Sequence, residues 1–141
     1  MEYLDKRINV IATELKKLSI NESISLDDWQ MKEGFFTCPK EADEDSSAWL
    51  SFNSKRDMWH GNDKYFWFRT AFTVPETLAG KHIQLSIASQ IESIYYAMNP
   101  QFLVFLNGEV RQGSDRNHKD IFLAKEGESG KKYIVDVQAY T

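Results

Sequence analysis

The chain has 141 residues, a formal net charge of −4 and 42% hydrophobic residues, which fits one soluble globular domain and excludes a disordered chain. It has no basic stripe and no apolar run of about 20 residues, so we expect neither a nucleic-acid partner nor a membrane span. The first residues show no signal-peptide pattern, and the single Cys38 excludes an internal disulfide framework. These features predict a cytoplasmic protein.

Residues 1–20 predict an amphipathic helix with a narrow apolar face. Large aliphatic residues recur at alternating spacings of four and three, as in a heptad repeat. They are Leu4, Ile8, Ile11, Leu15 and Leu18, and we call them the apolar stripe. A stripe this narrow must be covered, either by the rest of its own domain or by another domain or subunit.

Residues 21–141 predict a second unit built of about seven strands. Period-two apolar patterns separated by turn residues favour strands. Asn107-Gly108 between extended flanks predicts a tight hairpin, and the acidic stretch 40–47 predicts a surface loop. The predicted strands cover 29–37, 64–74, 82–89, 120–124 and 132–140, with the two arms of the hairpin within 101–110. Because strands do not alternate with helices, we expect an antiparallel β-sandwich preceded by one N-terminal helix.

The polar stretch RQGSDRNHKDIF (111–122) gathers acids, bases and a histidine into one short segment. His118 with Asp115 is the only local pair suited to a metal, and two ligands do not make a site without help from elsewhere. We therefore predict no metal or other cofactor in the 141-residue chain. Asp115 and Asn117 are typical turn residues, so we interpret Asp115, Asn117 and His118 as fixing a loop or contacting a neighbouring domain.

Four aromatic residues expected at strand ends or in loops are candidates for binding sugar, because the apolar face of a pyranose ring stacks on Trp or Tyr. They are Trp49, Trp59, Tyr95 and Tyr96. Such side chains more often pack in the core or cover a sheet edge. Sugar binding by these residues therefore competes with a structural role.

Two stretches carry a series of short motifs in a fixed order. Within 59–81, Trp-x-Gly leads into Tyr-x-Trp-Phe-Arg, then Val-Pro and Leu-x-Gly-Lys; within 99–123, an Asn-Gly hairpin is followed by Gly-x-Asp-x-Asn-His. The residues are Trp59, Gly61, Tyr65, Trp67, Phe68, Arg69, Val74, Pro75, Leu78, Gly80, Lys81, Asn107, Gly108, Gly113, Asp115, Asn117 and His118. In this order and spacing, the motifs resemble the N-terminal region of family 38 glycoside hydrolases, the α-mannosidases of the bacterial and cytosolic type.

The resemblance implies a β-sandwich similar to galactose-binding domains, with their jelly-roll order of strands. It also implies a separate downstream catalytic domain, in which His and Asp residues hold zinc and an Asp is the nucleophile of a retaining mechanism. The His-x-Asp-x-x-Trp motif that opens that domain has no match here, so no catalytic or zinc residue carries over.

The expected function is therefore that of a non-catalytic N-terminal domain of an α-mannosidase, inactive as a 141-residue segment. Such a domain would pack on the downstream catalytic domain, shape the rim of its site and help assembly. Two alternatives stay open. One is a carbohydrate-binding module, and the other is a pure oligomerisation module in which the apolar stripe forms a homo-oligomer.

Overall fold

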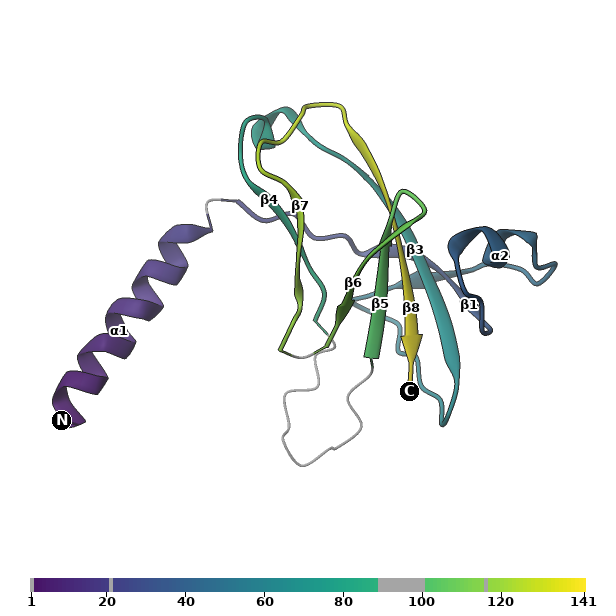
Figure 1. Cartoon of the computed structure of the whole chain (residues 1–141), viewed down its shortest axis with the longest axis horizontal. Coiled ribbons are helices and arrows are strands. Elements are labelled where there is room, and N and C mark those ends of the chain that lie inside the picture. The colour runs from purple at the N-terminus through teal and green to yellow at the C-terminus, as the bar shows by residue number, and fades with distance from the viewer. Residues whose placement is uncertain (1, 21, 89–100, 116) are drawn as a thin grey trace.

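The computed structural model describes residues 2–20, 22–88, 101–115 and 117–141. These residues form a sandwich of two antiparallel sheets that follows one long helix in the chain (Figure 1). The helices are α1 (Glu2–Ser19) and α2 (Pro39–Glu44), with a single 3₁₀ turn at Glu76–Leu78. The strands are β1 (Asp28–Glu33), β2 (Leu50–Asn53), β3 (Tyr65–Thr73), β4 (Ile83–Ser86), β5 (Gln101–Leu106), β6 (Glu109–Ser114), β7 (Asp120–Ala124) and β8 (Lys132–Tyr140).

The larger sheet has six strands in the order β2-β1-β3-β8-β5-β6, and β4 pairs with β7 in the smaller one. Every pairing between the described strands is antiparallel. β3 and β8 form the centre of the large sheet and pair along their whole nine-residue lengths. The predicted antiparallel sandwich behind an N-terminal helix is confirmed, whereas the jelly-roll order of a galactose-binding domain stays a prediction.

The main core lies between the two sheets. Side chains that alternate along β3, β5 and β8 share the inner face of the large sheet, and β7 meets them from the smaller sheet. The fully or nearly buried members are Phe66, Phe68, Val104, Ile121, Val135, Val137 and Ala139. Burial of this apolar surface is the main force that holds the two sheets together.

The outer face of the large sheet is partly covered by the segment between β1 and β2, which contains α2. Trp67 of β3 and Phe105 of β5 point to this face and are buried there against Ala42 of α2. Phe36 and Trp49 pack around them. The first half of β3 is therefore buried on both faces, which is why its sequence is nearly continuously aromatic.

Several strand and turn predictions are confirmed. β7 and β8 have the predicted bounds, and β3 lies within the predicted range. Asn107 and Gly108 adopt positive φ angles of 50° and 86°, as a tight hairpin between β5 and β6 requires. The Asn107 side-chain oxygen also accepts a hydrogen bond from the Ile134 amide at 2.9 Å, so the turn is tied to β8.

Other predictions were wrong in detail. β1 ends at Glu33 rather than at 37, because Gly34 takes a φ of 150° that redirects the chain over the outer face. The stretch 40–47 is partly helical, since Pro39 suits a first helical turn and Ala42 finds a buried site. β4 ends at Ser86 rather than at 89, and β2 was not predicted, so the described residues contain eight strands.

Candidate functional site

The apolar stripe lies on α1, which projects away from the sandwich (Figure 1). Each of its five residues is at least 54% exposed, and every side chain from Tyr3 to Ser19 is exposed. Nothing in the described part of the chain covers the stripe, so it does not pack on its own sandwich. A row of large aliphatic side chains left in water is typical of a docking surface.

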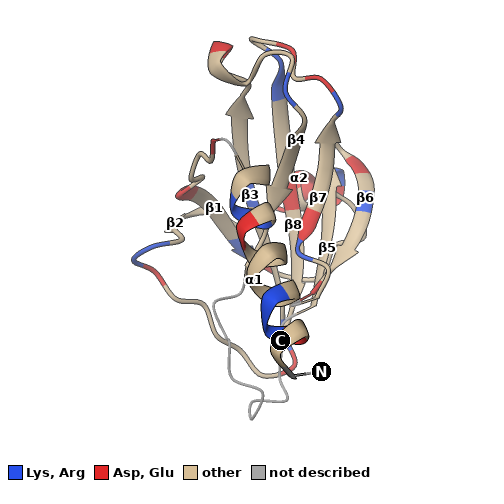
Figure 2. Ribbon diagram, turned by 90° about the vertical axis from the view of Figure 1, so that its left-hand side faces the viewer, with Lys and Arg blue, Asp and Glu red and all other residues tan. Residues whose placement is uncertain are grey.

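Charged residues of both signs lie along α1, where they colour its ribbon blue and red in Figure 2. Arg7 and Glu14 follow one edge of the stripe, and the Arg7 guanidinium lies 6.0 Å from the centre of the Tyr3 ring. Glu14 forms an exposed ion pair with Lys17 at 2.9 Å. An apolar centre with a polar rim is the usual anatomy of a protein interface.

The loop between β6 and β7 is organised by one carboxylate. Asp115 Oδ1 accepts hydrogen bonds from the backbone amides of Asn117 at 2.7 Å and of His118 at 2.9 Å, and lies 3.0 Å from His118 Nδ1. These hydrogen bonds lower the pKa of Asp115, and the bond from the Asn117 amide has the largest effect. Among the described residues no group of three metal-ligating side chains occurs. Asp115 thus holds the loop, while the His118 side chain stays 74% exposed.

The two described tryptophans among the sugar-stacking candidates have packing roles. Trp59 makes edge-to-face contacts with Phe66 and Phe68 of the main core, with ring centres 5.3 and 5.4 Å apart. Trp49 covers the outer face, where the Arg69 guanidinium lies 4.8 Å from the centre of its ring. The other two candidates, Tyr95 and Tyr96, fall outside the described residues.

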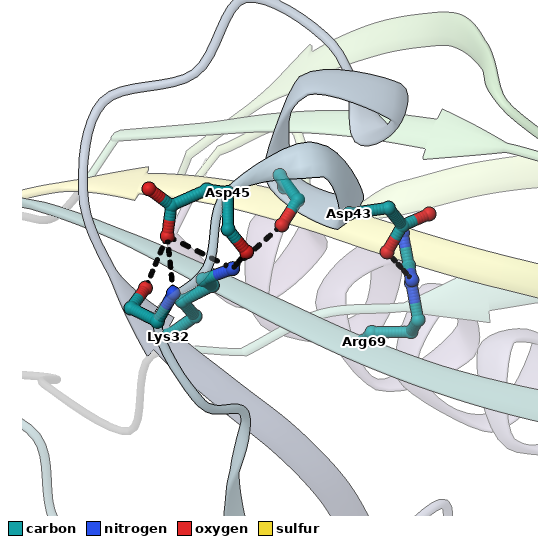
Figure 3. Close-up of polar contacts among 6 residues, drawn as sticks. Lys32, Asp43, Asp45 and Arg69 are labelled. Atoms are coloured by element: carbon teal, nitrogen blue, oxygen red, sulfur yellow. Dashed lines mark hydrogen bonds and ion pairs between the residues drawn. The ribbon is translucent and has the colours of Figure 1, made fainter.

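A buried lysine holds α2 against the sheet, as Figure 3 shows. Lys32 of β1 is 2% exposed, and its Nζ donates to the carbonyl oxygens of Ala42 at 2.7 Å and Asp45 at 2.9 Å. The same Nζ lies 3.1 Å from the Asp45 carboxylate. Hydrogen bonds from Ser47, and then from Lys32, lower the pKa of Asp45 to about 2. Lys32 therefore supplies both charge and donors at the C-terminal end of α2, where helix carbonyls lack partners.

A second ionic contact joins α2 to the centre of the sheet. Arg69 of β3 bonds Asp136 of β8, which is 1% exposed. Arg69 also bonds Asp43 of α2 (Figure 3). Burial raises the pKa of Asp136, and the neighbouring Arg69 opposes that rise. Sequence reasoning missed this contact. Its signal was a single arginine in β3 and a single acidic residue in β8, at positions that the β3–β8 register makes partners.

Beside α2, the outer face is open and forms a shallow hollow of about 420 Å³. Its lining side chains, all uncharged, are Tyr65, Gln101, Phe102, Leu103, Gln138 and Tyr140. The rings of the two tyrosines lie 4.8 Å apart, and Gln138 donates to the Phe36 carbonyl at 2.6 Å. The Tyr140 hydroxyl donates to the Asp63 carboxylate, so Tyr65 and Gln101 supply the polar groups that can bind a neutral, hydroxyl-bearing ligand.

Comparison with known proteins leaves the motifs as the sole link to a family. No family model matches the chain, and neither does any curated protein or solved structure compared with it. The resemblance to family 38 glycoside hydrolases therefore rests on the motifs within 59–81 and 99–123. Neither described helix is long and apolar enough to cross a membrane.

Proposed function

We propose that the chain is a non-catalytic accessory domain of a cytoplasmic α-mannosidase. It packs on the catalytic domain of its parent protein and helps the parent assemble. The observation that carries the accessory role is the uncovered apolar stripe on α1, because exposed aliphatic rows of this kind are interaction surfaces. In this proposal zinc, the nucleophile and the retaining hydrolysis of α-mannosidic bonds belong to the downstream catalytic domain.

The α-mannosidase identity is supported by the motifs and by the structural roles of the motif residues in packing, ion pairs and turns. Trp67 is buried under α2, and Arg69 joins β3 to β8 and to α2. Gly80 and Gly108 have φ angles of 72° and 86°, which L side chains rarely adopt. Asp115 holds the β6–β7 loop. Residues that a fold needs at fixed positions are expected to recur in a fixed order among domains of the same kind.

An activity assay tests this function. The purified 141-residue chain should release no nitrophenol from para-nitrophenyl α-mannoside, with or without added zinc. Robust zinc-dependent release would contradict the accessory role. The reading frame downstream of the chain should encode a His-x-Asp motif at the start of a catalytic domain, and a complete downstream sequence without one would contradict the α-mannosidase identity.

A carbohydrate-binding module is a second candidate function, favoured by the hollow around Tyr65 and Tyr140 rather than by the tryptophans. Titration with mannose, mannobiose or galactose should then shift the side-chain amide signals of Gln101 and Gln138 in a saturable way. Tyr65→Ala should abolish the shift, while Tyr3→Ala on α1 should not. No saturable shift at millimolar sugar would count against this function.

A further inference from the structure

We propose that α1 pairs antiparallel with α1 of a second copy of this chain. This pairing goes beyond the accessory role and does not depend on which enzyme the domain serves. The stripe follows a heptad in which Ile8 and Leu15 occupy a positions and Leu4, Ile11 and Leu18 occupy d positions. Its residues are exposed and lie on one face of a helix that stands clear of the sandwich.

Among the antiparallel registers, one gives matched layers of side chains. In an antiparallel pair each a position of one helix packs against a d position of the other. Placing Leu4 opposite the partner's Leu15 also places Ile8 opposite the partner's Ile11. The twofold axis then repeats both contacts, so two central Ile–Ile layers lie between two outer Leu–Leu layers. Side chains of equal size meet in each of these four layers, which favours close packing, and Leu18 lies beyond them.

The charges beside the stripe select the same register. Arg7 and Glu14 occupy the two g positions of the helix, and g positions face each other across an antiparallel pair. In the register just given, Arg7 faces the partner's Glu14, and Glu14 faces the partner's Arg7. Both contacts are attractive, and charges at such flanking positions set partner choice and orientation in paired helices.

The alternative arrangements lose these attractions. Sliding the antiparallel pair by one heptad in one direction places Arg7 opposite the partner's Arg7. Sliding it in the other direction places Glu14 opposite the partner's Glu14. A parallel pair in register places Arg7 opposite the partner's Ala12 and Glu14 opposite the partner's Ser19, so no ion pair forms. Charge complementarity therefore points to one antiparallel register of two copies.

The position of the sandwich is compatible with this pairing. α1 has 18 residues and is about 27 Å long, and the sandwich follows its C-terminal end (Figure 1). An antiparallel pair therefore places the two sandwiches at opposite ends of the helix pair. A parallel pair would bring both sandwiches to the same end, where they would compete for space.

A charge-swap series tests the pairing in the full chain. Sedimentation velocity should show a dimer that forms between micromolar and millimolar concentration. Arg7→Glu and Glu14→Arg should each weaken it by about tenfold at low salt, because each creates two like-charge contacts. The double variant should regain the wild-type dissociation constant. A wild-type chain that stays monomeric, or a double variant no better than the single ones, would overturn the proposal.

Cysteine cross-linking tests the orientation, in a Cys38→Ala background that removes the native thiol. A mixture of Leu4→Cys and Leu15→Cys chains should form a disulfide between the two species on oxidation, while neither variant alone should cross-link. A Leu15→Cys homodimer would overturn the antiparallel pairing. A monomeric chain that binds the separately expressed downstream catalytic domain through the stripe would also overturn it, and would leave the accessory function intact.

Discussion

The two helices of the described chain show that the sequence pattern of a helix and its burial have different origins. α1 is long and strongly patterned, yet every side chain from Tyr3 to Ser19 is exposed. α2 has six residues and no periodic pattern, yet Pro39 and Ala42 are buried. A helix as short as α2 is unstable by itself. It forms because the sheet supplies a buried lysine and an arginine to hold it, whereas α1 offers its apolar face to a partner.

The largest expected effect concerns the ionic contact beneath α2. Asp136→Ala should lower the free energy of unfolding by about 3–5 kcal/mol, because it leaves the Arg69 charge without its buried partner. Asp43→Ala removes the exposed partner of the same arginine and should cost less than about 1 kcal/mol. Urea unfolding measures both. Equal losses would mean that burial does not distinguish the two carboxylates.

Lys32→Met should have the next largest effect. It keeps most of the aliphatic chain but leaves the carbonyl oxygens of Ala42 and Asp45 without their donor, at a cost of about 1–3 kcal/mol. The matched control is Lys40→Met, because Lys40 lies on α2 itself and is 82% exposed, so it should change stability by less than about 0.5 kcal/mol. Similar effects of the two changes would contradict the contrast between a buried and an exposed lysine.

The Asp45 carboxylate makes the packing of α2 against the sheet sensitive to acid. Its pKa in the folded chain is about 2, below its ordinary value of 3.8. Its stabilising contribution is therefore complete above about pH 4 and is lost as the pH falls towards about 2. Asp45→Asn should remove this part of the pH dependence. The difference in unfolding midpoint between wild type and Asp45→Asn should shrink as the pH falls through this window, and a constant difference would contradict the assignment.

The β6–β7 loop is an intermediate case, exposed like α1 but internally bonded like α2. Asp115→Ala should lower the melting temperature slightly, because the amides of Asn117 and His118 lose their acceptor. Asp115→Asn keeps an acceptor oxygen and should lose less. Differential scanning calorimetry compares the two variants. An unchanged melting temperature in Asp115→Ala would indicate that the loop residues serve a contact with sugar or with a neighbouring domain instead.

Much of the fold could be predicted because its signals are local. The heptad spacing of α1, the alternating residues of β8 and the Asn107-Gly108 turn are each contained within a short stretch. The same reasoning explains why the sequence identified the apolar stripe but could not show whether anything packs on it. Periodicity shows which face of a helix is apolar, and only tertiary structure shows whether anything packs on it.

The parts that were missed depend on contacts between distant residues. α2 forms where Ala42 meets Trp67 and where Lys32 reaches the end of the helix, and no window of sequence around 40–47 contains either partner. β2 follows Trp49 and needs β1 as its neighbour. The hollow of the outer face combines Tyr65 of β3 with Gln138 of β8, so its residues become neighbours only after the strands pair.

The central claim is that the apolar stripe of α1 pairs with a second copy of the chain and is not part of the sandwich core. Sedimentation velocity and thermal unfolding of wild type and Leu15→Asp test it together. We expect that the wild type associates with rising concentration, that Leu15→Asp stays monomeric, and that both unfold at the same temperature in dilute solution. Monomers in both cases, or a clear loss of thermal stability in dilute Leu15→Asp, would contradict it.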